Sequence, residues 1–271
     1  MIAVDYHDEL KDVQGDAVLA ALLSAPQACA PFDRLEWWQA LVDQYQGQAL
    51  IAVASLGPHR AVLPLLRRGR QLHCLANWYT FRVAPLLTPG AKEAKLLTAL
   101  AADLAGQTPH LVLAPLPDEH GIASAMAAAL RQSGWTTFVE PCDVNHVLRV
   151  NGRTFREYLA DRPGSLRTLL KRKAGKVAIT IETAFEPASW ASYEAIYAQS
   201  WKGDEGNPGF LHTFARQEGA AGRLRLAIAR FDGRPVAAQF WSVEAGTAFI
   251  HKLAHVEDAR GLSPGTSVTA A

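Results

Sequence analysis

Hydrophobic positions occur along the chain in short alternating runs, separated by stretches with helical spacing. Residues 32–47 form a predicted amphipathic helix, and residues 49–78 have the pattern of three strands joined by two turns. Helices are predicted over 91–106 and 121–135, with a buried strand between them at 110–116. We therefore expect the first half to be mixed α/β.

The second half begins with a basic and mostly helical segment, residues 151–176, which Pro163 and Gly164 interrupt. Three elements are predicted after it: a strand over 177–184, a helix over 188–201 and a glycine-rich loop over 202–209. This order also favours a mixed α/β fold.

Residues 223–256 contain three β-type runs joined by tight-turn sequences, Asp-Gly at 232–233 and Glu-Ala-Gly at 244–246. They predict an antiparallel meander. The meander leads into the sequence Ser-Pro-Gly at 263–265, where a helix is expected to begin.

The two halves share an order of elements. Each has strands linked by tight turns, followed by a Thr-Pro-Gly (88–90) or Ser-Pro-Gly (263–265) entry into a helix. This order is typical of a duplicated unit, although identity between the halves is too low to establish a repeat. We therefore expect domains at 1–150 and 151–271, the second entered through the basic segment 151–176. A single large α/β domain is the alternative.

The composition, 49% hydrophobic and 20% charged over 271 residues, is that of a soluble globular protein with room for two cores. The 27 basic and 26 acidic residues give a net charge of +1, so any basic binding site must be local. No apolar stretch approaches the roughly 20 residues of a membrane span, and no signal peptide is visible. A cytoplasmic location is expected.

The spacing of the cysteines and the absence of common catalytic motifs limit the types of site and reaction that the sequence indicates. Cys29, Cys74 and Cys142 lie far apart and form no CxxC pair, which disfavours a disulfide framework or a zinc site. The sequence also lacks a GxSxG elbow, a GxGxxG fingerprint and a P-loop. Covalent serine or cysteine catalysis is therefore not indicated.

The segment 261–267 is a candidate anion site. Ser263 suits a helix N-cap, Pro264 the first helical position, and Gly265 allows a ligand to approach the backbone closely. A diphosphate fits such a helix start. An ordinary capped helix start has the same sequence, so both interpretations remain open.

Residues 200–267 resemble the C-terminal half of the CelD-like acetyltransferase family, which is related to the FemAB-like proteins and to the GNAT superfamily. The matching pieces are "SWK", "FDGRPVAAQ", "HKLAH" and "LSPGT". In the first half, "FDRLEWWQALVD" and "LVLAPLP" also resemble that family. The resemblance implies two GNAT-like domains, an acyl-CoA donor such as acetyl-CoA, no metal, and an amine on a sugar or other small metabolite as acceptor. It also implies a role in polysaccharide or envelope biosynthesis.

The same resemblance implies where the ligands bind. The coenzyme would contact residues at the end of the last strand and in the following segment: Leu253, Ala254, Leu262, Ser263, Pro264, Gly265, Thr266 and Ser267. The acceptor would contact four residues: Trp201, Lys202, Gln239 and His251. Direct transfer from a thioester needs a proton acceptor, and the candidates are His255 and Glu205.

Members of the family continue beyond the Ser-Pro-Gly helix with strands that complete the second sheet. The sequence ends at Ala271, so we expect an incomplete second domain and a C-terminally truncated chain. The oligomeric state is left open.

His251 and His255 are expected to lie on one face of a strand about 13 Å apart, too far to bind one zinc ion.

The basic residues of 151–176 form either a solvated helix face or a phosphate contact. A non-catalytic scaffold of polysaccharide synthesis, or a FemAB-like aminoacyl transferase that uses tRNA, is the alternative function.

Overall fold

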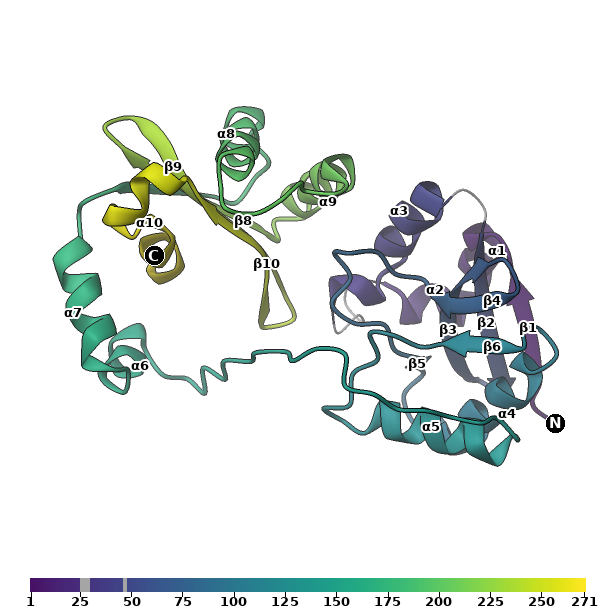
Figure 1. Cartoon of the computed structure of the whole chain (residues 1–271). Helices are drawn as coiled ribbons and strands as arrows, with labels where there is room; N and C mark the ends of the chain where they lie inside the picture. The colour runs from purple at the N-terminus through teal and green to yellow at the C-terminus, as the bar shows by residue number, and fades with distance from the viewer. Residues whose placement is uncertain (25–29, 46–47) are drawn as a thin grey trace. The chain divides into compact units, whose positions relative to one another are not determined.

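The computed structural model describes residues 1–24, 30–45 and 48–271, and the chain divides into two compact units, Met1–Val144 and Asn145–Ala271 (Figure 1). Each unit contains a β-sheet covered by helices, so the fold is mixed α/β as predicted. Cys29 lies outside the described residues.

The strands of the first unit pair in the order β1-β2-β3-β4-β6, with β5 also beside β3. Their bounds are β1 Ala3–His7, β2 Ala49–Leu56, β3 His59–Arg68, β4 Gln71–Cys74, β5 Leu86–Leu87 and β6 His110–Val112. The helices are α1 Leu10–Gly15, α2 Ala17–Leu22, the 3-10 turn η1 Pro31–Asp33, α3 Leu35–Tyr45, α4 Glu93–Leu104 and α5 Ile122–Gln132.

Both faces of this sheet are covered, which explains the nearly continuous apolar sequence of β2 and β3. On one face Leu63 and Leu65 pack in a cluster with Leu97 and Leu100 of α4 and Met126 of α5. The predictions for α3, β2 to β4, α4, β6 and α5 are confirmed, whereas β1, α1, α2 and β5 were not predicted.

The sheet of the second unit has the order β10-β9-β8-β7, all antiparallel. Its strands are β7 Ala178–Glu182, β8 Leu224–Phe231, β9 Arg234–Glu244 and β10 Thr247–His255. The helices are α6 Phe155–Ala160, α7 Gly164–Lys173, α8 Pro187–Ala198, α9 Pro208–Ala220, the 3-10 helix η2 Glu257–Leu262 and α10 Pro264–Ala270. In Figure 1, α8 and α9 lie near one face of this sheet and α10 near the other.

The predicted meander is confirmed as β8, β9 and β10. Its turns use left-handed backbone at Asp232 and Gly233 (φ 48° and 81°) and at Ala245 and Gly246 (φ 47° and 75°). These values suit the tight hairpins that connect right-twisted strands. The basic segment is also helical as predicted, with α6 and α7 on either side of Pro163.

Helix α9 was not predicted, and the glycine-rich loop was expected to extend over its first two residues, Pro208 and Gly209. Asn207 caps it by accepting a hydrogen bond from the N–H of Phe210 at 3.0 Å. Near its C-terminal end, Gly219 allows Phe185 to approach: an added Cβ would lie 2.6 Å from the Phe185 nitrogen.

We expect Gly219→Ala to destabilise the second unit by about 1–3 kcal/mol, because the new methyl group collides with backbone. Helix propensity alone would favour alanine by about 1 kcal/mol, so the sign of the change is diagnostic. Gly209→Ala in the same helix is the control, since its added Cβ meets only ordinary contact at 3.6 Å. Urea unfolding measures both variants, and a stabilised Gly219→Ala protein would contradict the predicted contact.

Candidate functional site

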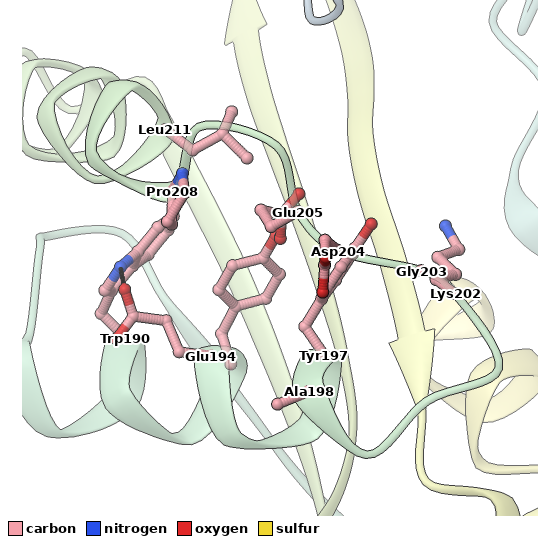
Figure 2. Close-up of a pocket in the computed structure, with 11 residues that line it drawn as sticks. Trp190, Glu194, Tyr197, Ala198, Lys202, Gly203, Asp204, Glu205, Pro208 and Leu211 are labelled. Carbon is pink, nitrogen blue, oxygen red and sulfur yellow. Dashed lines mark hydrogen bonds between the residues drawn. The ribbon is translucent and has the colours of Figure 1, made fainter.

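The second unit contains a cavity of about 430 Å³ between α8, the loop that follows α8 and the start of α9 (Figure 2). The side chains that α8 contributes have the spacing of one helix face. They are Trp190, Tyr193, Glu194, Tyr197 and Ala198. The loop contributes Lys202, Gly203, Asp204 and Glu205, and α9 contributes Pro208 and Leu211.

Both carboxylate oxygens of Glu205 are engaged in the wall of this cavity. Oε1 lies 2.8 Å from Nζ of Lys252, and the hydroxyl of Tyr193 donates a 2.7 Å hydrogen bond to Oε2. The side chains of Lys252 and Glu205 are only 9% and 11% exposed. Nζ of Lys252 also lies 5.4 Å from the centroid of the Tyr197 ring. The ion pair therefore ties the loop to β10 and α8.

A β-bulge in β10 explains how Lys252 reaches the cavity wall. Ile250 lies opposite Trp241 of β9, and Lys252 lies opposite the next residue, Phe240, so His251 is the extra residue of the bulge. The bulge changes the alternation of side chains, because two consecutive residues now turn toward α8 and α9. Both His251 and Lys252 are buried.

The bulge also separates the two histidines that were expected to share a face. Nε2 of His251 lies 2.8 Å from the Ser242 hydroxyl, and its ring contacts Phe214 of α9 at 5.0 Å between centroids. His255 instead lies beside α10, where Cβ of a side chain at Gly265 would be 3.5 Å from its Nδ1. The prediction that both histidines lie on one face of the strand is wrong, because the extra residue of the bulge shifts the alternation of side chains by one position.

Lys202 carries a perturbed amine at the cavity edge. Burial lowers its pKa, and the neighbouring charge of Lys252 lowers it further, while Glu205 acts in the opposite direction. Burial and then the charge of Glu205 raise the pKa of the Tyr197 hydroxyl. The cavity therefore contains one lysine that releases its proton more easily than an exposed lysine does.

Trp201 and His255 connect the cavity with the segment 262–267. Their ring centroids lie 4.4 Å apart. Trp201 directly precedes Lys202 of the cavity wall, and His255 lies beside Gly265 of the segment. The loop after α8 and the segment 262–267, both predicted to bind ligands, are thus adjacent in this unit.

Ser263 occupies the N-cap position of α10, and Pro264 the first helical position, as predicted. The expected side-chain cap is not formed within the described residues, because Ser263 has left-handed backbone (φ 53°, ψ 45°). Its carbonyl accepts hydrogen bonds from the N–H of Ser267 at 3.2 Å and from the Ser267 hydroxyl at 3.3 Å. The N–H groups of Gly265 and Thr266 belong to the first helical turn, which has no intrahelical acceptors.

The side chain of Gln239, a predicted acceptor contact, lies on the face of the sheet toward α10, opposite to the face that carries Lys252. It lies opposite Leu253 of β10, and Cδ1 of Leu253 lies 3.9 Å from the position of an added Cβ at Gly265. Gln239 is 1% exposed, and its Oε1 has no hydrogen-bond partner among the described residues. Ala254 is fully buried.

The basic residues of α7 and its flanks are mainly exposed, among them Arg167, Lys171, Arg172 and Lys176. Lys173 is different, because its Nζ donates a 2.6 Å hydrogen bond to the carbonyl of Gly261, just before the segment 262–267.

In the described part of the chain, no three His, Cys, Asp or Glu residues are grouped to hold a metal ion. Nor does any helix there have the length and apolar character needed to cross a membrane.

The family comparison concerns this second unit. The sequence model for the acetyltransferase (GNAT) domain matches residues 149–271. This part of the chain is a GNAT domain. It contains the cavity, the bulge in β10 and the segment 262–267.

Two solved structures are similar to this chain over most or all of its length. The C-terminal domain of a protein described as a lysylphosphatidylglycerol synthetase from Agrobacterium fabrum is 14% identical, with a TM-score of 0.47 over 96% of this chain and 72% of that one. A tandem GNAT protein from the clavulanic acid biosynthesis pathway, solved without acetyl-CoA, is 15% identical, with a TM-score of 0.48 over 100% of this chain and 84% of that one. No curated protein sequence matches the chain significantly.

Sequence reasoning missed several side chains that build the site of the GNAT domain. Trp190, Tyr193 and Tyr197 follow one another at helical spacing and could have been recognised as an aromatic stripe. Lys252 gave no such signal, because its place in the cavity wall depends on the bulge.

Proposed function

We propose that the GNAT domain transfers an acyl group from acyl-CoA to an amine. The match of residues 149–271 to the acetyltransferase (GNAT) domain carries this proposal. The geometry supports it, because Trp201 and His255 lie between a cavity of small-molecule size and the candidate coenzyme segment. The finer assignment to CelD-like enzymes of polysaccharide biosynthesis rests on the sequence resemblance alone.

The residues of segment 262–267 fit a coenzyme diphosphate in their chemistry. Gly265 has no side chain to block the first-turn N–H groups, and the hydroxyl groups of Thr266 and Ser267 lie in the same turn. When bound, acyl-CoA supplies an activated thioester. Lys173, which already contacts the carbonyl of Gly261, is a further cation near this segment.

The protein's own groups would manage the proton of the amine. His255 lies between the cavity and the segment, where a neutral imidazole can accept a proton from the attacking amine. Both oxygens of Glu205 are engaged by Lys252 and Tyr193, which suits it to shape the wall and to act as proton acceptor only with rearrangement. A transfer of this kind needs no covalent enzyme intermediate.

Calorimetric titration of acetyl-CoA into the 271-residue chain tests the donor assignment. Micromolar binding would support it, whereas the absence of binding would favour a non-catalytic binding module. Release of the free coenzyme thiol in the presence of an amine then tests transfer itself.

We expect Gly265→Leu to weaken acetyl-CoA binding about tenfold or more. An alanine Cβ meets only ordinary contacts there, but the longer leucine side chain must displace His255 or cover the first-turn N–H groups, a steric cost of about 1–3 kcal/mol. Gly15→Leu is the control, because nothing lies within 4 Å of its added Cβ. Equal affinities of the two variants for acetyl-CoA would remove this segment from the donor site.

A further inference from the structure

The cavity beside α8 has the size of a small-molecule site. Its volume of about 430 Å³ falls within the range of about 300–1,000 Å³ that is usual for such pockets. Its walls come from one helix face, one short loop and the first turn of the next helix. A volume of this size favours a compact ligand over an extended polymer.

Aromatic side chains form one wall of this cavity. The ring centroids of Trp190 and Tyr193 lie 4.7 Å apart, and those of Tyr193 and Tyr197 lie 6.0 Å apart. Such rings bury the apolar body of a ligand, and their faces attract a positive charge. Lys252 already uses the Tyr197 ring in this way from behind the wall.

The charges of the wall favour a positive ligand. Three carboxylates line the cavity, from Glu194, Asp204 and Glu205, whereas Lys202 is the lining cation in the described residues. Lys252 balances Glu205 from behind, so the wall with Lys252 included carries three negative and two positive charges, a formal balance of −1.

We propose that this cavity binds the acceptor as a compact organic cation, an amine that carries an apolar or aromatic body. The inference rests on the proposed acyl transfer and names its acceptor class. In the balanced reaction, the ammonium group first loses one proton to solvent. The nitrogen then forms a bond to the thioester carbon as the C–S bond breaks, and its second proton passes by way of His255 to the coenzyme thiolate, which becomes the free thiol.

The chemical test compares three probes that share a 4-hydroxyphenylethyl body and differ in the charge of the end group, by titration into the full chain. They are tyramine as the cation, 2-(4-hydroxyphenyl)ethanol as the neutral analogue and 3-(4-hydroxyphenyl)propionate as the anion. We expect tyramine to bind at least about tenfold more tightly than the anion, with the neutral probe between them. Equal or tighter binding of the anion would overturn the inference. Tighter binding of glucosamine than of tyramine would overturn the requirement for an apolar body.

The location is tested with Asp204→Asn, which we expect to weaken tyramine binding several-fold. Asp232→Asn makes the same change of charge in the turn between β8 and β9 and should leave the affinity unchanged. Glu194→Gln is the second cavity variant, in case Asp204→Asn folds poorly. An equal loss in the Asp232 variant, or no loss in either cavity variant, would overturn the location.

Acetyl-CoA binding, measured on the same samples, separates this inference from the proposed function. Acetyl-CoA binding without a preference for tyramine would overturn the acceptor class and leave acyl transfer in place. A preference for tyramine without acetyl-CoA binding would support the cation site and overturn the donor assignment.

Discussion

Replacing Lys252 with methionine is expected to cost the second unit about 3–5 kcal/mol of unfolding free energy, because the substitution leaves the Glu205 carboxylate buried beside an apolar side chain. The pair is 9% and 11% exposed, so water cannot readily solvate the remaining charge. Urea unfolding, with hydrogen exchange of peptides from residues 145–271, measures the loss.

The double variant Lys252→Met with Glu205→Met should regain most of this stability, since no isolated charge is left in the wall. Lys171→Met is the matched control, because Lys171 is exposed on α7 and should change stability by less than about 0.5 kcal/mol. A loss of the same size in the control, or no recovery in the double variant, would contradict the role of the buried pair.

The elements of the second sheet could be predicted because their signals are local. Asp232, Gly233 and Gly246 tolerate left-handed backbone, and the apolar runs on either side of the two turns have the period of a strand. Helix α9 also has a local signal at its start, but that signal was not recognised. Its first residues, Pro208 and Gly209, resemble loop sequence unless Asn207 is recognised as the cap.

The bulge could not be predicted in the same way, because it is defined by the register between β9 and β10. A regular strand would place His251 and His255 on one face, whereas the extra residue turns His251 and Lys252 to the same side. The largest error in the candidate site follows from this one residue.

The loop after α8 was predicted to carry functional residues, and the structure shows why such a prediction is only partial. The sequence shows the polar residues Lys202, Asp204 and Glu205 of this loop, but the partners of Glu205 come from α8 and β10. A contact between Glu205 and Tyr193 spans twelve residues and requires the loop to fold back on its helix. Sequence can supply the polar groups of such a site, while tertiary packing decides which of them meet.

Phe240→Ala is expected to cost about 3–5 kcal/mol, since it removes a fully buried ring from the centre of the second unit. The ring lies 5.7 Å from that of Trp190 on α8 and 5.8 Å from that of Phe214 on α9, between centroids. It also lies 5.0 Å from the His251 ring at the bulge. One side chain thus supports both helices of the cavity and the strand that carries Lys252.

Phe231→Ala is the control for this substitution, because Phe231 is 40% exposed at the end of β8 and its loss should cost under about 1 kcal/mol. Unfolding free energies of the two variants are compared in urea, and hydrogen exchange reports whether α8 and α9 open together. If the Phe240 variant were as stable as the Phe231 variant, the ring would not join the helices to the sheet. If stability falls and both helices lose protection at once, packing on Phe240 holds the cavity walls in place.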